Sequence, residues 1–169
     1  MHNIAFVGID PGLTGAVALI YKSLASEEWQ VAIADTPLIE RKTKKEKTTY
    51  DPLGMHILID DIDRNTFNVV CVLEEPHAMR NGSIANFSLG YGLGLWRMSL
   101  LGYPDWMIEM VSPNRWKKKL GLSSDKNYSR QKAIELFPSM HDKLKLVKNH
   151  GRAEALLLAE YGRRLHSNA

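Results

Sequence analysis

Three carboxylates stand where an apolar segment of the chain ends or where a helix meets the core. Asp10 closes the apolar run 4–9, and Glu74 closes a second run of strand length, 69–73. Glu154 lies on or beside the apolar stripe of a helix near the C-terminus. If the two strands are parallel neighbours, both acids emerge at one sheet edge and the helix adds the third. The sequence therefore predicts one convergent acidic site.

Such a site needs a cation, because like charges at a half-buried sheet edge cost several kcal/mol unless something offsets them. His150 precedes Glu154 by one helical turn, so the set holds oxygen ligands and at most one imidazole. That set suits Mg²⁺ or Mn²⁺ better than Zn²⁺. Two such ions about 4 Å apart can activate a water beside a phosphodiester and stabilise the departing oxygen. The residues predict phosphoryl transfer to water.

Each of these residues also has a purely structural explanation. Asp10 before Pro-Gly could be a turn residue, and Glu74 or Glu75 could be an exposed strand end. Glu154 could be a charge favoured by the helix macrodipole, and His150 a surface residue at the start of that helix. The catalytic interpretation depends on all of them lying at the boundary of one core.

The elements that must position these side chains follow an α/β pattern. Strands are expected at 4–10, 15–21, 29–34, 69–73 and 107–111. Helices are expected at about 53–63, 83–101, 113–120, 124–137 and 149–166. Short connections make the first three strands antiparallel, so we expect a five-stranded mixed sheet flanked by helices in a single domain, 1–169.

Four further features concern packing and loops. The basic stretch 41–47 is expected to be a mobile loop. Glycines at 90, 92 and 94 do not fit a dinucleotide fingerprint, and close helix packing explains them better. Trp116 is expected to be a core anchor rather than a stacking platform. Cys71, the single cysteine, is expected to be a buried thiol.

The composition fits one globular unit with an uneven charge distribution. The chain has 169 residues, 44% of them hydrophobic and 24% charged, which excludes the disordered and disulfide-rich classes. No apolar stretch reaches about 18 residues and no secretion signal begins the chain, so a soluble, intracellular protein without a membrane partner is expected. Residues 111–169 carry 13 Lys and Arg against 5 Asp and Glu, whereas residues 1–110 carry 9 against 14. The basic C-terminal part suggests a polyanionic partner such as nucleic acid.

Three ordered segments resemble one known family. The segments GIDPGLTGA (8–16), VLEEPHAM (72–79) and HGRAEALLLA (150–159) are similar to the RuvC family of Holliday junction resolvases, most closely its bacteriophage-type and chloroplast-type members. VSPNRWKK (111–118) is similar as well, so the resemblance runs nearly end to end. It implies a ribonuclease H-like fold, a homodimer with two active sites and paired nicking of four-way DNA junctions. The expected cofactor is Mg²⁺ or Mn²⁺, two ions per site, with no nucleotide cofactor. The expected products carry 5′-phosphate and 3′-hydroxyl ends, and the expected location is the cytoplasm of a bacterial or phage-infected cell.

The resemblance also assigns roles to residues. The implied catalytic metal ligands are Asp10, Glu74, His150 and Glu154. Relatives usually carry Asp where this chain has Asn149, so this catalytic position departs from the pattern and impaired cleavage is one consequence. The loop residues His77, Met79 and Arg80 lie where RuvC-like proteins contact the junction, and the alternative is that they are plain loop residues. Independently of the resemblance, basic side chains crowd the side that carries the last helix and suit contacts with DNA phosphates. They are Arg115, Lys117, Lys118, Lys119, Lys148 and Arg152.

Two alternative functions remain at this point. One is a junction-DNA-binding protein of the same fold that has lost activity, for which Asn149 is the evidence. The other is a lobe of an actin-like ATPase, because the segment 8–14 also resembles the phosphate loop of that superfamily. The length of the chain disfavours the second alternative, since such enzymes enclose the nucleotide between two lobes.

Overall fold

A mixed five-stranded sheet forms the centre of the computed structural model, which describes residues 4–22, 28–39, 43, 47–65, 68–76 and 83–167. The sheet strands are β1 (Ala5–Asp10), β2 (Ala16–Lys22), β3 (Trp29–Asp35), β6 (Val69–Glu74) and β7 (Met107–Val111). Their order is β3-β2-β1-β6-β7. The first three are antiparallel, whereas β1, β6 and β7 run parallel. This confirms the predicted five-stranded mixed sheet and its α/β class.

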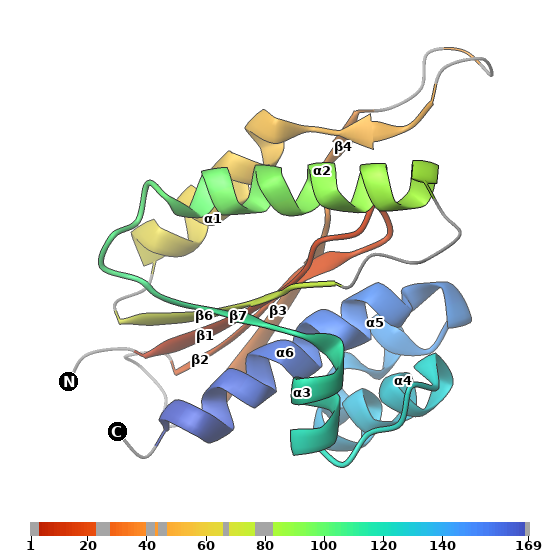
Figure 1. Ribbon diagram of the computed structural model, residues 1–169. Helices are drawn as coiled ribbons and strands as arrows, with labels where there is room; N and C mark the ends of the chain where they lie inside the picture. The colour runs from red at the N-terminus through yellow and green to blue at the C-terminus, as the bar shows by residue number, and fades with distance from the viewer. Residues whose placement is uncertain are drawn as a thin grey trace.

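Helices cover both faces of the sheet (Figure 1). The helices α1 (Pro52–Asn65) and α2 (Ser83–Leu100) lie on one face, and they share an apolar core with the side chains of Val7, Ile9 and Leu73. The helices of the C-terminal third cover the other face. They are α3 (Pro113–Lys119), α4 (Lys126–Leu136), α5 (His141–Leu144) and α6 (His150–His166). Alternate residues of β1 therefore enter different cores, as a sheet buried on both sides requires.

The expected helices all form, and their ends lie within two residues of the predicted positions. Pro113 occupies the first turn of α3, where its missing N–H leaves no hydrogen bond unmade. Asp125 caps α4 by accepting a hydrogen bond from the backbone N–H of Asn127 at 2.8 Å.

Several short elements escaped prediction. Strands β4 (Leu38–Ile39) and β5 (Thr49–Tyr50) form a two-stranded ladder beside the main sheet. Two 3₁₀ turns, Pro138–Met140 and Val147–Asn149, flank α5. Elements of two to four residues are too short for a hydrophobic period to indicate them. Most of the stretch 41–47 lies outside the described residues, so the prediction of a mobile loop stays a prediction.

Helix α6 packs against β1 and the turn that follows it without a gap. A Cβ atom at Gly8 would lie 2.1 Å from the carbonyl oxygen of Ala155, and one at Gly151 would lie 2.0 Å from that of Thr14. Both positions therefore accept only glycine as long as the helix keeps its place. This contact fixes α6 relative to the end of β1, where Asp10 lies.

Packing explains only one of the three glycines of α2. A Cβ atom at Gly92 would lie 2.4 Å from the ring of Tyr50 and 2.6 Å from the carbonyl oxygen of Pro11, which confirms close packing there. Around Gly90 and Gly94, by contrast, no heavy atom of the described residues lies within 4 Å of such a Cβ. The prediction that close helix packing explains the glycines is therefore wrong for these two positions.

The other packing expectations hold. Cys71 is fully buried in β6, and Trp116 is fully buried between α3 and the sheet. None of the helices in the described ranges is both long and apolar enough to cross a membrane.

Candidate active site

Asp10 and Glu74 end adjacent parallel strands at the same level. Ile9 of β1 pairs with Leu73 of β6, and each acid is the next residue. Glu74 is 8% exposed, and Glu154, which α6 carries against β1, is 6% exposed. The three carboxylates come from segments far apart in the sequence and meet at one edge of the sheet.

The pKa of Asp10 reflects the burial of this carboxyl group and the charge of Glu154 near it. Burial and the negative charge of Glu154 raise the pKa of Asp10 to about 6, although the backbone N–H of Gly12 donates to Asp10 Oδ1 at 3.2 Å and works in the opposite direction. Lys126 and His150 also lie near enough to lower this pKa. The fold therefore holds Asp10 where burial and a nearby negative charge make the ionised carboxylate unfavourable.

Glu74 is perturbed in the same way. Its burial is the largest cause, and the charges of Asp10 and Glu154 add to it, so that its pKa rises to about 7. The indole Nε1 of Trp116 donates a hydrogen bond to Glu74 Oε1 at 2.8 Å and partly offsets the rise. Trp116 is thus both a core residue and the group that orients Glu74.

Glu154 has a cation of its own. Lys117 Nζ lies 2.7 Å from Glu154 Oε1, and both side chains are largely buried, at 15% and 8% exposed. Sequence analysis assigned Lys117 to the DNA backbone, but the structure directs its ammonium into the carboxylate cluster. The neighbouring ring of Trp116 lies 5.2 Å from the same ammonium.

The chemistry of this donor set fits a divalent metal. Carboxylates with raised pKa values at one buried edge are groups that Mg²⁺ or Mn²⁺ would stabilise in their ionised form. Among the residues that the structure describes, however, no three His, Cys, Asp or Glu side chains are close enough to surround one ion. To bind an ion, Glu154 would have to part from Lys117.

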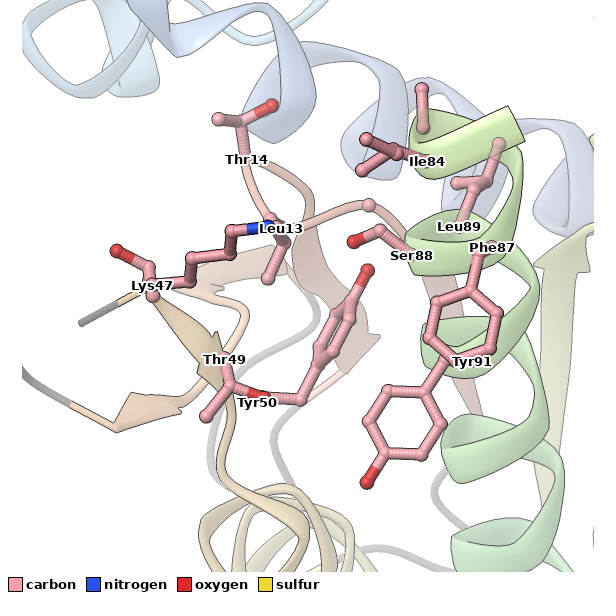
Figure 2. A pocket seen from close by; sticks show the side chains of 13 residues that line it. Leu13, Thr14, Lys47, Thr49, Tyr50, Ile84, Phe87, Ser88, Leu89 and Tyr91 are labelled. Atoms are coloured by element: carbon pink, nitrogen blue, oxygen red, sulfur yellow. The ribbon is translucent and has the colours of Figure 1, made fainter. Parts of the chain in front are cut away.

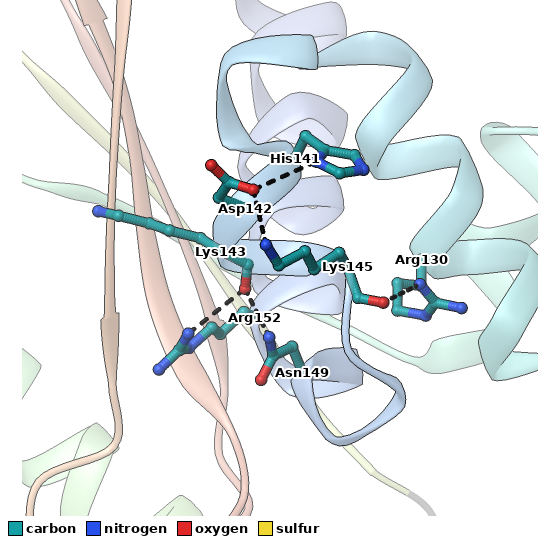
Figure 3. Close-up of polar contacts among 7 residues, drawn as sticks. All are labelled: Arg130, His141, Asp142, Lys143, Lys145, Asn149 and Arg152. Atoms are coloured by element: carbon teal, nitrogen blue, oxygen red, sulfur yellow. Dashed lines mark hydrogen bonds and ion pairs between the residues drawn. The ribbon is translucent and has the colours of Figure 1, made fainter.

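His150 and Asn149 lie at the start of α6 in different surroundings. His150 is half-buried, and its Nδ1 lies 3.3 Å from the carbonyl oxygen of Val147. Asn149 is 7% exposed, and its Nδ2 donates to the carbonyl oxygen of Lys143 at 2.8 Å (Figure 3). The amide of Asn149 therefore has a structural hydrogen bond that a carboxylate could not make.

The expected DNA-binding residues divide into three groups. His77, Met79 and Arg80 lie outside the described residues. Four basic side chains are exposed on α3 and before α6, and Arg115 among them lies 3.6 Å from Glu109. They are Arg115, Lys118, Lys119 and Lys148. Arg152 is instead paired with Asp35, its Nε and Nη2 each 2.5 Å from a carboxylate oxygen.

A large apolar pocket of about 980 Å³ borders the site. It lies between the turn after Asp10, strand β5 and the start of α2, and Figure 2 shows the ring of Tyr50 between Leu13 and that helix. Tyr50 donates from its hydroxyl to the carbonyl oxygen of Pro11 at 3.2 Å. This bond holds the turn that carries Asp10 against the α2 side of the molecule.

Three functional features escaped the sequence analysis. They are the hydrogen bond from Trp116 to Glu74, the pairing of Lys117 with Glu154, and the proximity of Lys126 to Asp10. No local signal could have found them, because adjacent residues of a helix point in different directions and each of these contacts joins segments far apart in the chain.

Comparison with known proteins identifies the fold. No protein-family model matches the chain. The chloroplastic Holliday junction resolvase MOC1 of Chlamydomonas reinhardtii is 36% identical over 83 residues, which make up 48% of this chain and 9% of that protein. Thermus thermophilus RuvC in complex with a Holliday junction substrate superposes with a TM-score of 0.55 at 13% identity, covering 99% of this chain and 98% of that one. A second T. thermophilus RuvC structure gives 0.53 at 14% identity, covering 96% of each chain. This chain therefore has a RuvC-like resolvase fold and a distant relative in MOC1.

Proposed function

We propose that this chain is a metal-dependent endonuclease that resolves four-way DNA junctions by paired nicks. The observation that carries the proposal is the meeting of Asp10, Glu74 and Glu154 at one sheet edge of a RuvC-like fold. The likeness to RuvC and MOC1, both named as Holliday junction proteins, supports the choice of substrate. Cleavage of the junction would leave 5′-phosphate and 3′-hydroxyl ends.

The residues of the site have distinct tasks in this proposal. Asp10, Glu74, Glu154 and His150 would hold Mg²⁺ or Mn²⁺, two ions per site, which would supply the activation of water and the stabilisation of the departing oxygen. Trp116 holds Glu74 in place through its indole N–H. Burial raises the pKa of Asp10 and Glu74, so these carboxylates gain most from a bound cation.

The surface beside the site has the charge that DNA requires. Exposed cations on α3 and before α6 flank the edge at which the acids meet, and they suit contacts with backbone phosphates that carry no sequence information. Binding of a junction should accordingly weaken by about a thousandfold or more between low and moderate salt, if six or more phosphates are contacted.

One exposed face of α2 supports the proposal of a homodimer. Its large apolar side chains repeat at heptad spacing, and Gly94 completes the same stripe between Tyr91 and Met98. The stripe consists of Ile84, Phe87, Tyr91 and Met98 on α2 and Leu101 directly after it, which are 75%, 76%, 46%, 67% and 73% exposed. Exposed Gly90 and Gly94 would let a second copy of the helix cross closely, and the stripe is complementary to itself under a two-fold axis.

The test is incubation of a labelled four-way junction with the protein and Mn²⁺. Symmetric nicks in opposite strands with ligatable ends are expected, and linear duplex of the same sequence should stay intact. Binding of the junction in Ca²⁺ without cleavage in Mg²⁺ or Mn²⁺ would favour the alternative of an inactive junction-binding protein. Absence of junction binding at low salt would refute both.

A further inference from the structure

A second, smaller hollow of about 280 Å³ lies between the turn 13–15, the end of β3 and the start of α6. Its walls include Thr36, Asp35, Lys148, Asn149 and Arg152. Nothing in the proposed cleavage chemistry uses it. Its lining mixes apolar and polar groups and carries two cations against one carboxylate, whereas the pocket beside α2 is mainly apolar.

One wall residue of the hollow, Thr36, has a buried hydroxyl that finds no partner among the described residues. Thr36 is 3% exposed, and within the described part of the chain its Oγ1 makes no hydrogen bond. The backbone of Thr36 is fixed, because its N–H donates to the carbonyl oxygen of Gly15 at 3.1 Å. A buried polar atom left unpaired is costly, and such atoms in native proteins usually have a reason. A ligand that accepts a hydrogen bond in the hollow would be such a reason.

The charged residues of the hollow are held in place. Arg152 uses Nε and Nη2 on Asp35 and Nη1 on the carbonyl oxygen of Lys143, which also accepts from Asn149 (Figure 3). The Arg152 hydrogen bond holds the pKa of Asp35 below its usual value, and exposed Lys148 lies near enough to lower it further. Asp35 is thus neutralised by Arg152, and Lys148 leaves the hollow positive.

The helix that begins here adds to this potential. Asn149 stands at the N-cap position of the 17-residue helix α6, yet its side chain donates to Lys143 instead of capping the helix. The positive end of the macrodipole therefore remains available to an anion beside Lys148 and Thr36. An orphaned hydroxyl, a cation and a helix N-terminus together suit a phosphate group.

Two segments of the chain connect the hollow with the carboxylate site. Asp10 and the turn 13–15 belong to one short segment, and α6 carries both Arg152 and Glu154. We propose that the hollow binds one backbone phosphate of the cleaved DNA strand, with Thr36 Oγ1 donating to a phosphate oxygen, and so sets the position of that strand at the carboxylates. This inference rests on the proposed nuclease function and adds a specific positioning residue, Thr36.

The first test compares two buried hydroxyls. Ser129, fully buried on α4, also has an unpaired Oγ in the described structure, so Ser129→Ala is a matched control for Thr36→Val. Both variants should keep or raise the melting temperature. Only Thr36→Val should weaken junction binding in Ca²⁺, by roughly tenfold, as expected for loss of a hydrogen bond to a charged group. Equal binding by Thr36→Val and wild type would overturn the proposal.

The second test locates the phosphate. Single methylphosphonate substitutions, which remove the charge of one phosphate, are scanned through the cleaved strand of the junction. One position should weaken wild-type binding strongly and Thr36→Val binding distinctly less, because the variant has already lost part of that contact. Lys148→Met should reduce the slope of log binding constant against log salt concentration by about one, the amount expected for one lost phosphate contact. Thr36→Val should leave this slope unchanged. A scan with no position that distinguishes Thr36→Val from wild type would contradict the proposal.

A third arm separates this inference from the nuclease function. Inorganic phosphate should raise the melting temperature of the wild type more than that of Thr36→Val, whatever the protein does to DNA. If the wild type shows this protection but binds no junction, the proposed function fails and the hollow is a site for free phosphate only. If the wild type binds junctions but shows neither protection nor a sensitive phosphate position, the hollow is not a phosphate site.

Discussion

Lys117 Nζ and Glu154 Oε1 lie 2.7 Å apart inside the carboxylate cluster, so a lysine neutralises one of the acids that would hold the metal. Two cations cannot use the same carboxylate oxygen equally well. Lys117 and a divalent ion are therefore expected to compete for Glu154, and the ammonium is free to turn toward DNA once the ion is bound.

Replacement of Lys117 by Met should separate these effects. The metal-free protein is expected to lose about 3 kcal/mol of its free energy of unfolding, since the variant leaves Glu154 buried without its partner. Mn²⁺ affinity measured by calorimetry should rise, because a competitor is gone. Lys118→Met, at an exposed neighbouring position, is the control and should change neither quantity. Unchanged Mn²⁺ affinity in Lys117→Met would mean that Glu154 is not a metal ligand.

Neutral replacements of the acids should abolish cleavage and spare binding. Asp10→Asn, Glu74→Gln and Glu154→Gln are each expected to slow cleavage by about a thousandfold or more, since metal stabilisation of the reaction is worth several kcal/mol. Junction binding in Ca²⁺ should stay within a few-fold of wild type, because the Lys and Arg contacts are intact. Glu75→Gln is the matched control, as Glu75 is exposed beside Glu74. Retained cleavage in one of the three variants would exclude that residue from the site.

The stability of the metal-free protein should fall as the pH rises from about 3.8 to about 7. The pKa of Asp10 rises from 3.8 to about 6 on folding and that of Glu74 from 4.5 to about 7, so the native state keeps protons that the unfolded chain has already released. Each group stabilises the fold below its unfolded pKa, and this contribution is lost as the pH passes through the folded value. The lowered pKa of Asp35 acts in the opposite direction, but only below its ordinary value of 3.8.

Urea denaturation in the presence of a chelator at several pH values measures this effect. A decrease of a few kcal/mol between pH 5 and pH 8 is expected, and saturating Mg²⁺ should remove most of it by favouring the ionised carboxylates. The double variant Asp10→Asn, Glu74→Gln should show a much flatter profile. A wild-type stability that rises over the same range would mean that the acids are not buried together.

The apolar stripe of α2 can be tested by charge. Phe87→Glu with Met98→Glu should convert a dimer into a monomer in light scattering coupled to gel filtration, because the buried charges would face their own copies across the two-fold axis. The monomer should still nick junctions but without pairing the two cuts. Leu53→Glu alters an exposed leucine on α1 and serves as the control. A wild type that is monomeric at micromolar concentration would refute this interface.

Asn149→Asp distinguishes a ligand from a structural residue. The variant replaces the Nδ2 donor with an ionised acceptor that faces the carbonyl oxygen of Lys143. A loss of about 1–3 kcal/mol in stability is expected, with no gain in cleavage rate. Thermal melts and junction assays on the two proteins measure both quantities. Faster cleavage by the Asp variant would show that Asn149 impairs the natural site.

The sequence predicted the sheet edge because Asp10 and Glu74 each follow an unbroken apolar run. Such runs indicate central strands, and the parallel pairing of β1 with β6 then places both acids together. The spacing of the leucines placed Glu154 on or beside the inner face of its helix. Local rules narrowed the N-cap of α4 to Ser124 or Asp125, and the structure shows that Asp125 is the cap, through a bond between residues two apart.

The partners of the acids could not be predicted. Trp116 and Lys117 are adjacent in the chain, yet they reach different carboxylates, 42 and 37 residues away. Which side chain meets which acid depends on how α3 docks against α6, and no local pattern encodes that angle. The same limit applies to Arg152 and Asp35, which are 117 residues apart and whose pairing turns an expected DNA contact into the wall of a hollow.

The glycine contacts of α6 have a mechanical consequence. Gly8 and Gly151 leave no free space between this helix and the backbone of β1 and the 13–15 turn, so the helix cannot slide or tilt to follow an incoming strand. If this is the active site, a helix held so rigidly beside it cannot adapt its position to different nucleic acids. Discrimination would then depend on how easily the DNA deforms to reach it, and a branch point, where stacking is already interrupted, is the place where that deformation is cheapest.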